Sequence, residues 1–88
     1  MNYITIIEHA GDNLSAYFPD VPGCYTVGDT FEEILVNAAE VLAYHLEDEI
    51  PPPAARPLKA IIDEGLELDD TEIVTWISYV PAGTLTPA

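Results

Sequence analysis

The residue types that most often carry out chemistry are few in this chain and widely spaced. Its two histidines, His9 and His45, lie far apart, and neither has the His-Glu-x-x-His or Cys-x-x-Cys neighbours that build a zinc site. Its single cysteine, Cys24, follows a tight turn, where a cysteine is more often a small buried apolar residue than a nucleophile. No Gly-rich loop with a lysine opens a helix to hold phosphate. The pattern therefore predicts no catalytic residue and no cofactor.

Paired carboxylates are the remaining source of chemistry, because several converging acids can bind a divalent metal ion. Glu32 and Glu33 are neighbours in a predicted helix and therefore point in different directions, and Asp69 and Asp70 fall in a predicted turn. A metal-dependent nuclease needs carboxylates that converge from strand interiors. The predicted strands carry almost none there, since Glu8 and Glu72 sit only at strand ends. We therefore expect no metal site.

The charge balance is the strongest signal in the composition. The 88 residues include 16 acidic side chains against two basic ones, Arg56 and Lys59, which gives a formal net charge of −14. Such a chain repels nucleic-acid backbones and anionic membranes, since binding to either needs clustered Lys and Arg. Its favoured partner is a basic protein. Acidity also promotes solubility, so charge alone leaves that plainer explanation open.

The length and the hydrophobic pattern predict one small cytoplasmic domain. A hydrophobic share of 49% is typical of a folded globular chain. No apolar run approaches the roughly 20 residues that span a bilayer, and the first residues lack the basic region of a secretory signal. A lone cysteine agrees with a reducing compartment.

Strand and helix signals follow one another in the order β-β-β-α-β. Segments rich in β-branched and aromatic residues predict strands at 3–7, 14–18, 24–27 and 72–80. A long helix is expected from 31 to about 47, and a proline-rich connector at 50–57 leads into a short helical turn at 57–64. Residues 81–88 are expected to form a flexible tail. The predicted fold class is α+β, with one main helix on one face of a sheet.

The long helix has a start signal and one apolar stripe. Thr30 can cap the first turn, and Glu33 lies three residues later, which completes a capping box. Apolar residues then recur at three- and four-residue steps: Phe31, Ile34, Leu35, Ala38, Leu42 and Leu46. This spacing predicts a helix that buries one side against the sheet.

Apolar side chains on both faces of the predicted strands suggest a second contact surface. One helix can cover only one face of the sheet, so the other face, or an edge strand, is expected to meet another chain and give a dimer or tetramer. Trp76 and Tyr79 are the candidates for that oligomer interface, with a place in the core as the alternative for both. The alternative for the second face is that the proline-rich connector and the short helix cover it.

One long, ordered motif resembles a known family. The run Tyr17-Phe18-Pro19-Asp20-Val21-Pro22-Gly23-Cys24, then Gly28-Asp29-Thr30-Phe31-Glu32-Glu33, then Asn37-Ala38 and Glu40, is similar to the HicB-like antitoxins of toxin–antitoxin systems. The match is good over about the first 55 residues and loose at the last strand. The resemblance implies a partial ribonuclease-H-like fold without a working nuclease site. It also implies a partner, a small basic HicA-like toxin that degrades messenger RNA and that the antitoxin binds and masks.

The residues of this motif receive structural and contact roles. Pro19, Pro22 and Gly23 are expected to shape a turn, Gly28 to end the third strand, and Asp29 and Thr30 to cap the helix. The partner-binding candidates are Glu32, Glu33, Glu40 and Asp20. For the three glutamates the alternative is a solvated helical face, and for Asp20 it is a side-chain cap of its own turn.

Together these observations predict an antitoxin domain at 1–80, a tail at 81–88 and no DNA-binding domain. The expected function is binding and masking of a HicA-like toxin, without enzymatic activity. An orphan oligomeric domain that has no toxin is the alternative. A relict nuclease that uses Glu8 or Asp29 with a divalent metal is a third hypothesis.

Overall fold

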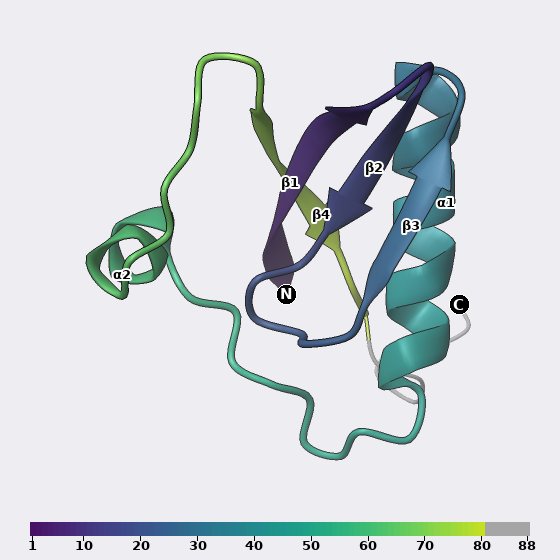
Figure 1. The fold of residues 1–88 in the computed structure, drawn as a ribbon. Coiled ribbons are helices and arrows are strands. Elements are labelled where there is room, and N and C mark those ends of the chain that lie inside the picture. Colours follow the sequence, from purple (N-terminus) through teal and green to yellow (C-terminus); the bar gives the residue numbers. More distant parts are fainter. Residues whose placement is uncertain (81–88) are drawn as a thin grey trace.

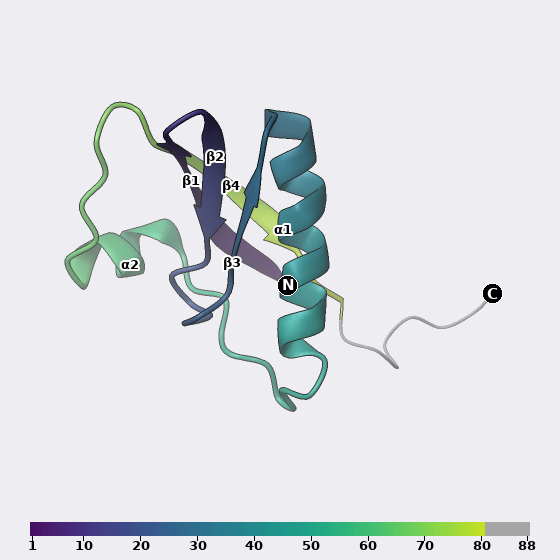
Figure 2. The ribbon, with the colours of Figure 1, turned by 45° about the vertical axis from the view of Figure 1, so that its right-hand side comes forward.

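Residues 1–80 are described by a computed structural model, which shows a four-stranded antiparallel sheet between two helices of unequal length (Figures 1 and 2). The strand order is β3-β2-β1-β4, so β3 and β4 form the two edges. The elements are β1 (Asn2–Ala10), β2 (Asn13–Tyr17), β3 (Tyr25–Gly28), α1 (Phe31–Leu46), α2 (Leu58–Asp63) and β4 (Ile73–Ser78). The predicted α+β class and element order are confirmed. The predicted tail at 81–88 lies outside the described residues.

The hairpin between β1 and β2 is tighter than the sequence suggested. Ala10 pairs with Asn13, so both belong to strands and only Gly11 and Asp12 form the loop. Gly11 has φ +67°, a conformation that a residue with a side chain adopts at an energetic cost. A two-residue loop with glycine in the first central position matches the twist of the flanking strands. This turn lengthens β1 and fixes its register with β2.

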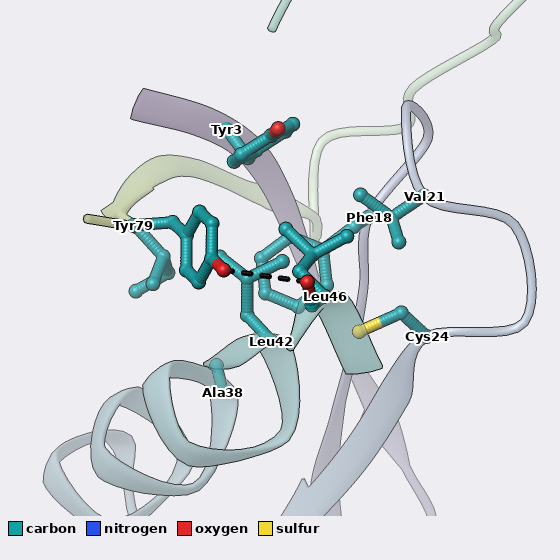
Figure 3. Packing of buried hydrophobic residues seen from close by; sticks show 9 residues of the cluster. Tyr3, Phe18, Val21, Cys24, Ala38, Leu42, Leu46 and Tyr79 are labelled. Carbon is teal, nitrogen blue, oxygen red and sulfur yellow. Dashed lines mark hydrogen bonds between the residues drawn. The ribbon is translucent and has the colours of Figure 1, made fainter. Parts of the chain in front are cut away.

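The larger core lies between α1 and one face of the sheet. Nine buried residues from the sheet, the 18–24 turn and α1 form it: Tyr3, Phe18, Val21, Cys24, Ala38, Leu42, Leu46, Ile77 and Tyr79 (Figure 3). A neighbouring cluster of Ile7, Ala16 and Ile34 extends it toward the hairpin. The predicted helix stripe is therefore buried along most of its length, although Phe31 at its start is 43% exposed.

The opposite face is covered in part by α2, which corrects the expectation of an open face. Ile4 and Ile6 alternate with the residues that face α1, and both are fully buried. They pack with Ile61 of α2 and with the partly buried side chains Tyr17, Leu58, Leu66, Leu68 and Val74. The alternative, that the short helix covers this face, is thus the observed arrangement around Ile4 and Ile6.

Candidate protein-binding surface

The exposed side of α1 carries acidic and apolar side chains in one line. Glu33, Val36, Glu40, Tyr44 and Glu47 are all exposed and recur at three- and four-residue steps, so they share one face of the helix. This line, which we term the α1 outer stripe, lies opposite the buried residues Ile34, Ala38, Leu42 and Leu46. Tyr44 is 77% exposed and Val36 57% exposed. The stripe therefore offers carboxylates and apolar contact area side by side.

The start of α1 differs in one bond from the predicted capping box. The Thr30 hydroxyl accepts a hydrogen bond from the Glu33 N–H at 3.1 Å. The Glu33 carboxylate accepts from the N–H of Asp29, at 3.3 Å, and not from that of Thr30. Glu33 thus stabilises the helix start. Within residues 1–80, no side-chain hydrogen bond or ion pair occupies Glu40 or Glu47, which leaves both carboxylates available to a partner. Glu32 is exposed on the flank of the same stripe.

Asp20 does not lie on an accessible surface, which corrects its expected role in partner binding. Its side chain is only 2% exposed and accepts hydrogen bonds from the main-chain N–H of Arg56 at 2.8 Å and from the Arg56 Nε at 2.6 Å. The expected cap of its own turn is also wrong, because the donors come from the connector. Arg56 bonds in addition to Glu64, just after α2. Asp20 therefore ties the connector to the turn between β2 and β3.

The two residues expected at an oligomer interface occupy different environments. Tyr79 is 8% exposed and its hydroxyl donates a hydrogen bond to the Leu46 carbonyl at 3.3 Å (Figure 3). Its side chain belongs to the core of its own chain, so its expected place at an interface is corrected. Trp76 is 54% exposed and lies in the edge strand β4. Of this pair, only Trp76 offers its side chain to another molecule.

The motif glycines and prolines shape the β2–β3 turn and the entry to α1. Gly23 has φ +83°, and Cys24 donates a main-chain hydrogen bond to the Val21 carbonyl at 3.1 Å, which closes the turn around Pro22. Pro19 precedes Asp20 at the start of this turn. A Cβ atom at Gly28 would lie 3.0 Å from the main-chain N of Ile34. Glycine at this position permits the close approach of β3 to the first turn of α1.

The geometry offers no support for chemistry at the groups that the sequence singled out. Burial raises the pKa of the Cys24 thiol to about 11, so the reactive thiolate is disfavoured at neutral pH. His9 is the second-last residue of β1, beside the hairpin, whereas His45 lies in the last turn of α1. The β1–β2 hairpin and the last turn of α1 are at opposite ends of the molecule (Figure 1). Within residues 1–80, no three His, Cys, Asp or Glu side chains cluster as metal ligands would.

Neither helix of the described part has the length and apolar character that crossing a bilayer requires.

Three features of the surface were not assigned a role from the sequence. Tyr44 and Val36 lie outside the apolar stripe that predicted the core, and their spacing to Glu40 is the signal that could have revealed the exposed stripe. Asn37 donates from its Nδ2 to the Val27 carbonyl at 2.9 Å, which joins α1 to β3. Arg56 is one of only two cations in the chain, and that scarcity could have marked it as an ion-pair partner.

Comparisons with known proteins place these features in a family context. The family described as "HicB_like antitoxin of bacterial toxin-antitoxin system" matches residues 3–80. An uncharacterized 14.9 kDa protein of Haemophilus phage HP1 is 37% identical over 68 residues, which cover 73% of this chain and 51% of the phage protein. A UPF0150 protein of Synechocystis sp. is 31% identical over 68 residues, covering 76% of this chain and 86% of its own length. The chain thus spans about half the length of the phage relative.

Solved structures with the same fold agree with the family match. The crystal structure of the antitoxin HicB3 has a TM-score of 0.70 at 30% identity and covers 100% of this chain and 68% of its own. The HicA3–HicB3 toxin–antitoxin complex contains a chain with a TM-score of 0.62 at 27% identity, covering 92% of this chain and 100% of that one. The N-terminal domain of Burkholderia pseudomallei antitoxin HicB has a TM-score of 0.73 at 16% identity, covers 91% of this chain and 99% of its own, and supports the fold alone.

Proposed function

We propose that this chain binds and masks a small basic HicA-like toxin, because it belongs to the family of HicB-like antitoxins. In this function it acts by surface complementarity and carries out no reaction of its own. The toxin–antitoxin complex of HicA3 and HicB3, one chain of which matches this fold, supports a toxin as the partner. The proposal includes action in the cytoplasm, where a toxin that degrades messenger RNA would have to be neutralised.

The observation that carries the proposal is the α1 outer stripe. Glu40 and Glu47 are unpaired within residues 1–80 and flank the exposed ring of Tyr44. Acidic groups around an aromatic anchor fit a basic protein, because the charges accelerate association and the ring supplies contact area that excludes water. The net charge of −14 extends this attraction over the whole chain. A toxin held there would have its RNA-binding charges covered by carboxylates.

Co-expression with the small protein encoded beside this gene tests the proposal. We expect a short basic reading frame there, a complex of the two proteins that survives purification, weaker binding at high salt, and restored growth of cells that express the toxin. A neighbouring toxin that neither binds this chain nor is neutralised by it would contradict the proposal.

A pair of charge-reversed variants locates the binding surface. Glu40→Lys combined with Glu47→Lys reverses the charge of two unpaired carboxylates of the α1 outer stripe. It leaves in place the hydrogen bond that the Glu33 carboxylate accepts from the Asp29 N–H at the helix start. We expect the dissociation constant for the toxin to rise by about tenfold to a hundredfold. The matched control, Glu67→Lys combined with Asp70→Lys, makes the same change in net charge at exposed sites between α2 and β4. Equal weakening by both variants would show a general charge effect and overturn the assignment to α1.

An orphan oligomeric domain without a toxin is the second candidate function. It is favoured by β4, which has a neighbouring strand on only one side within residues 1–80. Trp76 is exposed in an edge strand that carries no charge. The absence of a neighbouring toxin gene, together with a stable homo-oligomer in light scattering, would favour this function over the antitoxin. Self-association, and the expected lack of binding to nucleic acid and membranes, are predictions under both functions.

A further inference from the structure

The seam between β3 and α1 is closed by contacts at two levels. The Asn37 Nδ2 donates to the Val27 carbonyl at 2.9 Å, which joins the middle of α1 to β3. At the other level, a Cβ atom at Gly23, in the turn before β3, would lie 3.8 Å from the His45 Cε1 in the last turn of α1. The strand and the helix therefore lie side by side and run in opposite directions (Figures 1 and 2).

The two most exposed aromatic side chains of residues 1–80 lie on either side of this seam. Tyr25 of β3 is 69% exposed, and Tyr44 of α1 is 77% exposed. Tyr25 lies two residues from Val27, and Tyr44 lies two helical turns from Asn37, which places both toward the last turn of α1. The hydrogen bond between Asn37 and Val27 therefore holds the elements that carry the two rings in a fixed relation.

The side chains of β3 are left uncovered by α2. Tyr25 pairs with Tyr17 across the strands, so Tyr25 and Val27 point to the face of the sheet that carries α2. The packing around α2 is centred on Ile4 and Ile6 and reaches Tyr17, but it does not include Tyr25 or Val27. Val27 is 52% exposed. The strand therefore presents a ring and a branched side chain to solvent next to the α1 outer stripe.

The α1 outer stripe is too narrow to form a stable interface by itself. It is one face of a single helix, whereas a specific interface between two proteins takes about 20–30 residues from each side. On the flank of α1 away from β3, the exposed residues include Ala39 and Ala43, which offer little contact area. On the other flank, Asn37 leads directly to β3 and to the exposed side chains of Tyr25 and Val27. The interface therefore extends most readily over β3.

We propose that the toxin straddles the seam between β3 and α1, with Tyr25 and Tyr44 as its two aromatic anchors. This inference rests on the proposed function and adds the uncovered face of β3 to the α1 outer stripe. Carboxylates accompany both anchors, because Glu8 lies on the same face as Val27, across Ser15 of β2, and has no ion pair within residues 1–80. Charge attracts any basic protein, whereas two rings at a fixed spacing select the one whose surface fits both.

Titration calorimetry with the small basic protein encoded beside this gene tests the two anchors. Tyr25→Ala and Tyr44→Ala each remove one ring and keep the net charge of −14, so each is expected to raise the dissociation constant by about tenfold or more. Tyr25→Phe keeps the ring and should bind like the wild type. The control Ile62→Ala shortens an exposed apolar side chain of α2 and should also bind like the wild type. Circular dichroism melts of each variant verify that the chain still folds.

Amide hydrogen exchange of the wild-type chain gives a second readout that needs no substitution. The Phe18 N–H donates to the Cys24 carbonyl at 3.3 Å, so the alternation of an antiparallel ladder directs the N–H groups of Tyr25 and Val27 away from β2. These two amides should exchange rapidly in the free chain and about tenfold more slowly in the complex. The amides of α2 should exchange equally in both.

The outcomes separate this inference from the antitoxin function. Toxin binding that survives Tyr25→Ala, with unchanged exchange in β3, would overturn the second anchor and leave the α1 outer stripe as the toxin site. Equal weakening by Ile62→Ala would also overturn it, because the effect would then not be specific to the seam. A wild-type chain that binds no toxin would overturn the proposed function and this inference together.

Discussion

Asp20 and Arg56 are joined by two hydrogen bonds across 36 residues of sequence, one from the Arg56 main-chain N–H and one from its Nε. The carboxylate is buried, whereas the Arg56 side chain is about one third exposed. Side-chain hydrogen bonds to Asp20 and Glu64 raise the pKa of the Arg56 guanidinium, so this group stays positively charged. This pair anchors the connector, and through it α2, to the β2–β3 turn.

Asp20→Asn is therefore expected to destabilise the chain. The amide keeps the shape of the carboxylate but loses its charge, and the free energy of unfolding should fall by about 2 kcal/mol. Urea denaturation measures the change. The control is Lys59→Gln, which removes the ion pair between Lys59 and Asp63. These side chains are 85% and 61% exposed, so the substitution should change the free energy of unfolding by less than about 0.5 kcal/mol. Equal effects of the two substitutions would contradict a structural role for Asp20.

Gly28→Ala should strain the contact between β3 and α1. The added Cβ would lie 3.0 Å from the Ile34 main-chain N and 3.1 Å from its Cα. Backbone atoms cannot yield as a flexible side chain can, so we expect a loss of about 1–3 kcal/mol in the free energy of unfolding. Ala39→Ser, at an exposed position of the same helix, is the control for α1. A Gly28→Ala protein with unchanged stability would show that the helix start can shift freely.

Asn37 should be sensitive to the loss of its side-chain donor. Asn37→Ala removes the hydrogen bond to the Val27 carbonyl and should lower the free energy of unfolding by about 0.5–1 kcal/mol, since the site is only partly buried. Asn37→Asp replaces the donor with a charged acceptor of the same size and should be less stable than the alanine variant. Thermal melts that rank the aspartate variant level with the wild type would exclude this role for the amide.

Alkaline pH should destabilise the chain through its buried thiol. The fold raises the pKa of Cys24 from 9.0 to about 11, so the folded state favours the neutral form. This contribution is complete below pH 9 and is lost as the pH rises from 9 to about 11. Burial also raises the pKa values of Tyr3 and Tyr17 above 10.0, which adds to the loss in the same direction.

Two measurements check the prediction for Cys24. Unfolding free energies followed from pH 8 upward should decline, and Cys24→Ala should decline less steeply over the interval from 9 to about 11. Alkylation by iodoacetamide at pH 8 should be slow in the native protein and fast in denaturant, because only the unfolded thiol is accessible. Rapid alkylation of the native protein would show that the thiol is exposed.

Local patterns in the sequence predicted most of the secondary structure. The Thr30 cap, the stripe through Ile34, Ala38 and Leu42, and the β-branched run of β4 each depend on near neighbours, and each gave its element within a few residues. The sequence did not predict that β1 extends to Ala10, because it did not show that Gly11 and Asp12 alone form the turn. The predicted family also rested on short runs in a fixed order within residues 17–40.

The tertiary roles of individual residues could not be read from such patterns. Asp20 lies in a turn whose local sequence suggests a cap, yet its donors belong to a connector far along the chain. The layer formed by α2 was offered only as an alternative, because Leu58 and Ile61 are too few to show that a six-residue helix buries Ile4 and Ile6. Tyr79 and Trp76 are near neighbours in sequence, yet Tyr79 is buried and Trp76 is exposed. Only the position of β4 relative to α1 determines this difference.

The pairing of β1 with β4 also determines when the sheet can form. β1 is the first strand made during synthesis, but its central position between β2 and β4 is complete only after Ser78 has been added. The intervening chain must close a loop of about 70 residues, a contact of high sequence separation that slows folding. Until then the main-chain N–H and C=O groups of β1 that pair with β4 would be open to any other extended strand, so a nascent chain that stalls before β4 should be prone to aggregation.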